Sequence, residues 1–252
     1  MSPRRLLAAG AVAYLLALAL GAPAELLRAP LQASLPGLVP GPLAGHPVSG
    51  RAEGARLGTA RLDGVAWRLR PLGLLAGRVV FEIAIDGGPS HAELRITREV
   101  GDPGFVIERL DGEIDLAWLG EAVPSLPVRG TGRLVVEGAS VSLDPGGWPR
   151  SADGRLRLAA ADLQAPVPLT IGSAEGRIAV DDARLAIAFA LPGDGDLVGE
   201  GRAVLAPDGR ATFRAELAPA PGADRGVADL LRLAGRPRDD GRFAIDWSGR
   251  ME

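Results

Sequence analysis

The sequence predicts a mainly β protein. We expect an N-terminal transmembrane helix, then a single antiparallel, curved meander-type β-sheet or partly open barrel domain, with one short helix near the C-terminus. An apolar run opens the chain, apolar and polar residues alternate with a period of two over much of the rest, and 35 glycines and 21 prolines indicate frequent turns. With 252 residues, of which 47% are apolar, the chain has enough apolar surface for a packed core.

The apolar run at residues 6–20 follows Arg4 and Arg5. Together with the next few residues it would span roughly 27 Å as a helix, which is enough to cross the hydrocarbon core of a bilayer. The two arginines favour a cytoplasmic N-terminus, which places the remaining chain across the membrane. The alternative is a cleaved secretory signal, because residues 22–24 include the small residues that a signal peptidase requires. Both interpretations export the β domain.

Three parts make up the predicted chain. Residues 1–24 form a cytoplasmic tip and transmembrane anchor (or signal segment), residues 25–47 a proline-rich linker, and residues 48–252 a periplasmic β domain. In the linker, five prolines accompany leucines at partly helical spacing. We therefore expect a short amphipathic helical continuation and then irregular chain, with the sheet starting near Val48.

Alternating side chains are clearest at residues 79–86, 184–191 and 242–247, which we predict to be strands with one apolar face. Turn-forming residues lie between alternating runs, and we predict hairpins at residues 86–88, 192–195 and 207–209. Glycine recurs about once per hairpin, which favours a meander over a solenoid. Residues 226–234 are predicted to be helical because four of their apolar side chains share one face: Val227, Leu230, Leu231 and Ala234.

The composition argues against several functions. The net charge is −3 and no arginine cluster forms a stripe, so nucleic acid is not expected as a partner. The chain has neither cysteine nor lysine, which excludes disulfides, thiol nucleophiles, thiolate metal sites, P-loops and Schiff bases.

Few residues suit catalysis or metal binding. The two histidines, His46 and His91, lie in the linker and at the start of a strand, and we expect His91 to be a surface residue. Asp194 and Asp196 resemble part of a calcium loop but lack the further ligands, which favours a plain turn. We predict no catalytic residue, no cofactor and no metal ligand, and thus a protein that is not an enzyme.

The large aromatic side chains are the candidate binding residues. Trp67, Trp118 and Trp247 fall on the apolar side of their predicted strands, as do Phe81 and Phe189. Two interpretations stay open for these five residues. They fill the core, or they line a groove for a lipid or an extended peptide.

Residues 62–78 carry a specific motif. Leu62, Val65, Trp67, Leu69 and Pro71 are followed by a leucine pair and by Gly-Arg. This segment resembles the N component of the bacterial type II secretion system, whose pattern is Leu-x-x-Val-x-Trp-x-Leu-x-Pro with a following leucine pair and Gly-Arg. The C-terminal segment is similar to the family at Leu230, Leu231, Leu233, Gly241, Phe243 and Gly249. The resemblance implies an accessory inner-membrane protein of the apparatus that exports folded proteins, and it favours an uncleaved anchor.

Two functions remain. The first is a component of the secretion apparatus, single-pass in the bacterial inner membrane, whose periplasmic domain binds other secretion-system envelope proteins, for example by strand addition. The second is an envelope module that binds or transfers a lipid or lipoprotein in an apolar groove on the curved sheet. An open apolar trough around Trp67, Phe81, Ile187 and Phe189 would favour the second, and full packing of these side chains would favour the first.

Overall fold

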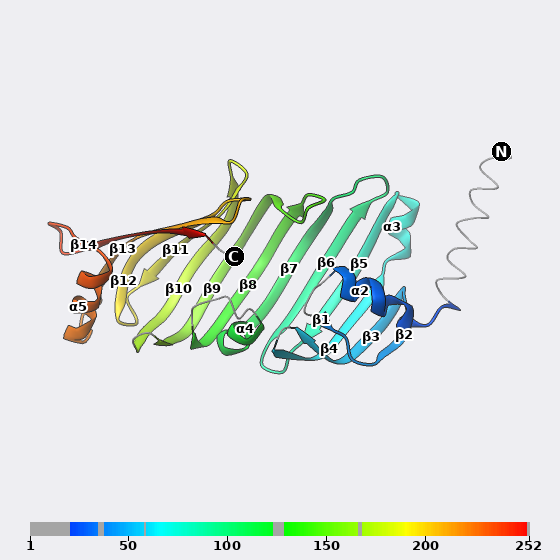
Figure 1. Ribbon diagram of the computed structural model, residues 1–252, viewed down its shortest axis with the longest axis horizontal. Helices are drawn as coiled ribbons and strands as arrows, with labels where there is room; N and C mark the ends of the chain where they lie inside the picture. Colours follow the sequence, from blue (N-terminus) through cyan, green and yellow to red (C-terminus); the bar gives the residue numbers. More distant parts are fainter. Residues whose placement is uncertain (1–20, 35–37, 58, 123–128, 166–167, 251–252) are drawn as a thin grey trace.

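The alternating side chains lie along one sheet. The computed structural model describes residues 21–34, 38–57, 59–122, 129–165 and 168–250, and within them 15 strands form a single sheet (Figure 1). Neighbouring strands pair antiparallel, for example β5 with β6 and β12 with β13. The prediction of a mainly β chain with one antiparallel sheet is confirmed.

The strands differ greatly in length, and those in the middle of the sheet are the longest. Their bounds are β1 (Leu38–Val39), β2 (Leu43–His46), β3 (Ser49–Leu57), β4 (Ala60–Leu69), β5 (Arg78–Asp86), β6 (His91–Glu99), β7 (Phe105–Asp115), β8 (Arg129–Leu143), β9 (Pro149–Ala165), β10 (Leu169–Asp181), β11 (Arg184–Pro192), β12 (Leu197–Leu205), β13 (Arg210–Pro219), β14 (Arg236–Pro237) and β15 (Phe243–Arg250).

The topology is a meander. From β4 to β12 each strand pairs with the strands before and after it in the sequence. At one end β1 and β2 pair with β3, and at the other β15 follows β13 with β14 outside it. Among the described strands the two ends of the sheet do not pair with each other, so the sheet is open. The three predicted hairpin turns are confirmed, because they connect β5 to β6, β11 to β12 and β12 to β13.

Short helices accompany the sheet: η1 (Ala24–Leu27), α2 (Arg28–Ser34), α3 (Pro71–Leu75), α4 (Leu116–Ala122) and α5 (Arg225–Ala234). Helix α5 confirms the helix predicted near the C-terminus. Its first turn is capped by Asp224, whose Oδ1 accepts a hydrogen bond of 2.7 Å from the Gly226 amide.

Helix α4 corrects one prediction. The sequence places Trp118 on the apolar side of a strand, and this is wrong, since β7 ends at Asp115. The Asp115 Oδ1 accepts hydrogen bonds from the amides of Ala117 and Trp118 at 2.9 and 3.1 Å. A carboxylate that caps the first turn in this way satisfies amides that lack a partner in the helix, and the chain turns out of the strand.

The predicted membrane-spanning run, residues 6–20, lies outside the described residues. In the described part of the chain, every helix is too short or too polar to cross a bilayer. After this run, η1 and α2 form the helical continuation that the sequence predicts. The chain that follows differs from the expected irregular linker, because β1 and β2 already pair with β3 before Val48. Pro40 and Pro42 are tolerated next to such short edge strands. Proline has no backbone amide to donate, and an edge strand forms hydrogen bonds on one side only.

Irregular pairing bends the sheet at its centre. Register shifts occur between β6 and β7, β7 and β8, β8 and β9, and β9 and β10. Extra residues in one strand of an antiparallel pair increase its twist and bend it. The long sheet is therefore curved rather than flat, and η1, α2, α4 and α5 lie along its margins (Figure 1).

Trp67 holds the N-terminal segment on the sheet. Its half-buried ring packs against the buried cluster of Ala24, Leu43 and Ala52. Its Nε1 donates to the carbonyl oxygens of His46 and Pro47, each at 3.2 Å. The ring therefore links β4 to the chain that enters the sheet.

We expect Trp67→Ala to lower the free energy of unfolding by about 3 kcal/mol, as truncation of a packed aromatic side chain does. The control is Leu233→Ala, because Leu233 is 87% exposed on α5. Its loss should cost only about 0.5 kcal/mol. Denaturant unfolding of the full chain in detergent measures both values. Equal losses would show that Trp67 is not a packing residue.

Candidate functional site

One face of the sheet is apolar across most of its width. Residues that point to this face lie opposite one another from strand to strand, so that each apolar side chain has an apolar or small neighbour on the next strand. The directly opposed pairs include Trp67 with Ile83, Ile83 with Leu94, Leu94 with Leu110, Val136 with Leu156, Leu134 with Leu158, Ile178 with Ile187, and Phe213 with Trp247.

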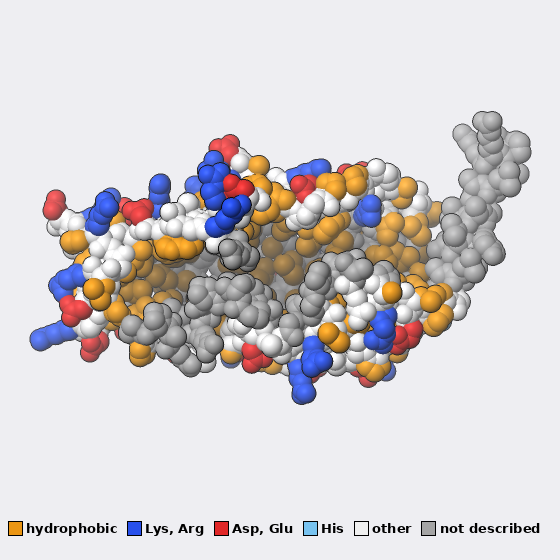
Figure 2. Space-filling model, in the orientation of Figure 1, with side chains coloured by type: hydrophobic (Ala, Val, Ile, Leu, Met, Phe, Trp, Pro, Cys, Tyr) orange, Lys and Arg blue, Asp and Glu red, His pale blue; other side chains and the backbone are white. Residues whose placement is uncertain are grey.

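The middle of this face is an apolar trough. We define the trough by six side chains on β5 to β10, of which only Val136 is buried and the other five are half-buried: Ile83, Leu94, Leu110, Val136, Leu156 and Ile178. Figure 2 shows hydrophobic side chains gathered in a hollow of the molecule. A second layer of structure normally covers such a face, and in the described residues the helices reach only its margins.

Helix α5 closes the C-terminal end of the apolar face. Val227 and Leu231 of the helix are buried together with Leu191, Leu217 and Phe243 from three strands. This cluster is the larger of the two buried cores in the described chain. The ring of Phe189 packs beside it and stacks on Phe213, with ring centroids 5.7 Å apart. The apolar face thus ends in a packed helix at this side.

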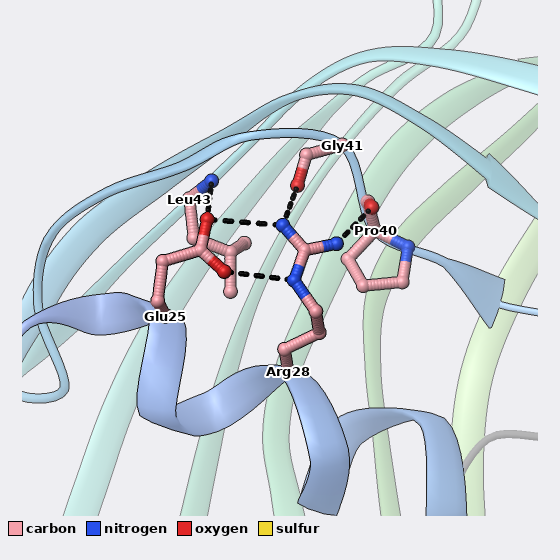
Figure 3. A network of polar contacts seen from close by, with 5 residues as sticks. All are labelled: Glu25, Arg28, Pro40, Gly41 and Leu43. Carbon is pink, nitrogen blue, oxygen red and sulfur yellow. Dashed lines mark hydrogen bonds and ion pairs between the residues drawn. The ribbon is translucent and has the colours of Figure 1, made fainter.

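A polar clamp closes the N-terminal end (Figure 3). The Glu25 carboxylate accepts from Arg28 Nε at 2.7 Å, and its Oε1 accepts from the Leu43 amide at 3.2 Å. Arg28 also donates to the carbonyl oxygens of Pro40 and Gly41, at 2.9 and 3.1 Å. The hydrogen bond from Arg28, followed by that from Leu43, lowers the pKa of Glu25. The clamp therefore ties the segment after residue 20 to the edge of the sheet.

The opposite face of the sheet is charged. Glu82 Oε1 accepts from Arg70 at 2.7 Å and from Arg95 at 3.0 Å, and the hydrogen bond from Arg70 is the main cause of the lowered pKa of Glu82. Further pairs follow on the central strands, such as Arg133 with Glu113 at 3.0 Å. Exposed pairs of this kind add little stability, but they keep the face in water. The sheet has one wet face and one apolar face.

The predicted binding aromatics separate into two groups. Trp67 and Phe81 lie on the apolar face near its N-terminal end, and Phe189 and Trp247 lie on the same face near its C-terminal end. Trp118 is apart from both, in α4, where its Nε1 donates to the Arg61 carbonyl oxygen at 2.8 Å. Aliphatic side chains occupy the trough between the two groups.

The polar residues that the sequence singles out are not drawn together. Asp194 and Asp196 lie in the turn between β11 and β12, as predicted, and they accept from amides of β10: Asp194 from Ser173 at 3.0 Å and Asp196 from Thr170 at 2.8 Å. His91 is exposed, as predicted. Among the residues that the structure describes, no group of three or more His, Asp or Glu side chains could hold a metal ion.

Comparison with known proteins places this sheet in a family. The model of the family described as "Type II secretion system (T2SS), protein N" matches residues 41–246, a stretch that runs from just before β2 into β15. No curated protein and no solved structure matches the chain. The match covers most of the 252 residues and includes the motif around Trp67. The chain belongs to the type II secretion system protein N family.

Proposed function

We propose that this protein is a non-enzymatic accessory component of the type II secretion machinery, with its β domain in the periplasm and residues 6–20 as a single inner-membrane anchor. Its membership of the protein N family supports an accessory role in type II secretion. The main support is that the family match covers almost the whole sheet, residues 41–246. We therefore assign the interaction with other envelope components to the surface of the sheet.

The clamp gives the anchor a defined position. Glu25 and Arg28 fix the chain to the sheet a few residues after the apolar run ends. A helix that crosses the inner membrane would therefore enter the domain without a long free tether. The sheet is then held close to the membrane surface, where other secretion-system proteins meet the periplasm.

We expect the full chain to fractionate with inner membranes and to resist extraction by high salt. The physical reason is that an apolar helix in the bilayer is held by the hydrophobic effect, which high salt does not weaken. Membrane fractionation with N-terminal sequencing of the mature protein measures this. A soluble mature form that begins at Glu25 would contradict the anchor and leave the cleaved signal.

The apolar trough favours a second candidate function, the binding of a lipid by its acyl chains. Each strand of the trough pairs on both sides, so its backbone amides and carbonyls are used within the sheet. An extended peptide laid on this floor would bury its own amides and carbonyls without partners, at a cost in free energy. An acyl chain has no such groups. The half-buried state of Trp67, Phe81, Ile187 and Phe189 supports this candidate.

The dimensions of the trough fit this ligand. The five steps from β5 to β10 cover about 24 Å at the usual spacing between strands. An acyl chain in one leaflet of a bilayer is about 15 Å long, half of the hydrocarbon thickness. One chain that lies across the strands is therefore accommodated between the two closed ends.

A photo-crosslinking amino acid at Leu94, one of the six trough residues, separates the two candidates. A lipid ligand predicts a crosslink to a lipid, seen by mass spectrometry of the purified full chain. A protein partner in the trough predicts a crosslinked band of higher mass. The matched control is the same substitution at Glu93, which precedes Leu94 on β6 and points to the charged face. Lipid adducts of equal yield at both positions would contradict a lipid site in the trough.

A further inference from the structure

The outer edge of β15 is open in the part of the chain that the structure describes. On the inner side of β15, the whole strand from Phe243 to Arg250 pairs with β13. On its outer side, β14 pairs only with Phe243 and Ala244. Outward-pointing amides and carbonyls beyond Ala244 therefore have no neighbouring described strand.

The two ends of the sheet differ in how they are protected. At the N-terminal end, β1 and β2 cover β3, and Pro40 and Pro42 lie between these short strands. Natural edge strands are blunted by prolines, lysines, bulges or short length. Strand β15 has no proline and no lysine, it pairs without a register shift, and Trp247 on it is 53% exposed. Its edge is suited to pairing with another strand.

The sequence of β15 is complementary to itself. In an antiparallel pair centred on Ser248, Asp246 lies opposite Arg250 of the second copy, and Trp247 lies opposite Gly249 of the second copy. The two-fold symmetry of such a pair forms each contact twice. Opposite charges at directly opposed positions stabilise antiparallel strands.

The charges around Arg250 favour this register. Arg250 lies directly opposite Arg210 on β13, and Arg210 is paired with Asp208 at 2.6 Å. Arg250 itself donates only to a backbone oxygen, that of Asp208, at 3.2 Å. Asp246 is paired with Arg214, at 3.3 Å, with both side chains largely exposed. Asp246 of a second copy would give Arg250 a carboxylate at a directly opposed position.

An aromatic ring opposite a glycine on the neighbouring strand occurs twice elsewhere in this sheet. Trp67 lies opposite Gly50, and Phe189 lies opposite Gly201. In both pairs the ring lies so close over the glycine that an added methyl group would overlap with it. Trp247 has Phe213 opposite it on β13, and its ring already lies over Gly249 of its own strand. In the pair centred on Ser248, Gly249 of the second copy lies opposite Trp247 and leaves the same room beside the ring.

Registers centred on neighbouring residues also keep both apolar faces on one side, but they pair the charges less well. Within the open edge, a register centred on Trp247 sets Asp246 against Ser248, and one centred on Asp246 sets the two Asp246 side chains against each other. We propose that β15 pairs antiparallel with β15 of a second copy, with Ser248 at the two-fold axis. The apolar faces of the two sheets then form one continuous surface.

Ser248→Cys tests this pairing in the full chain, because the protein has no other cysteine. The two thiols meet at the axis, and mild oxidation should give a disulfide-linked homodimer on a non-reducing gel. The matched control is Thr212→Cys, the residue opposite Ser248 on β13 and one strand further from the axis. Its thiols lie about 14 Å apart at normal strand spacing and should not crosslink. Equal crosslinking of the two variants, or a disulfide to a different protein, overturns the proposal.

Charge reversal tests the register. In the Ser248→Cys background, Asp246→Arg places arginine opposite Arg250 twice and should reduce the dimer yield about tenfold. Adding Arg250→Asp restores opposite charges and should restore the yield. Light scattering of the same full-length variants in detergent checks the mass. A yield that Asp246→Arg leaves unchanged, or that the second substitution fails to restore, overturns the register centred on Ser248.

Discussion

A single sheet that is apolar on one side cannot be stable in water with that side bare, and the structure is arranged around this constraint. The apolar face runs from β4 to β15, whereas the opposite face carries ion pairs such as Glu82 with Arg95. In a two-layered domain the second layer would cover the apolar side. Here the described helices cover only its ends, and the described residues leave the middle of the apolar face uncovered.

Curvature and end closure reduce the exposed apolar area in different ways. The register shifts between β6 and β10 bend the sheet around its apolar face. Helix α5 and the segment of η1 and α2 bury the ends, where the described cores lie. Neither curvature nor end closure covers the trough, where five of the six side chains stay half-buried. This division explains why the chain has small cores for its size and still forms an ordered sheet.

Period-two alternation predicted the sheet well, because side chains on a strand point to opposite faces whatever the tertiary contacts. The hairpins at Gly87, Gly193 and Gly209 followed from local turn chemistry in the same way. Local pattern did not predict helix α4. Leu116 and Trp118 continue the alternation, and only the cap by Asp115 marks the end of the strand.

The site was predicted less completely than the fold. Four of the five chosen aromatics do lie on the apolar face, but the trough between them is aliphatic, and alternation alone does not show which apolar face stays uncovered. The clamp of Glu25 and Arg28 depends on contacts with Pro40 and Leu43, more than ten residues away, which no local pattern indicates. The open edge of β15 likewise depends on where β14 stops pairing.

The whole structure depends on a sheet with one apolar face and one face in water. Nitroxide labels at four successive positions of β9, residues 155–158, test this difference between the faces most directly. The chain has no cysteine of its own, so a label attaches only to the one cysteine that is introduced. We predict that labels at Leu156 and Leu158 collide mainly with oxygen and labels at Arg155 and Arg157 mainly with a water-soluble nickel complex. Equal accessibility to the nickel complex at all four positions would contradict the account.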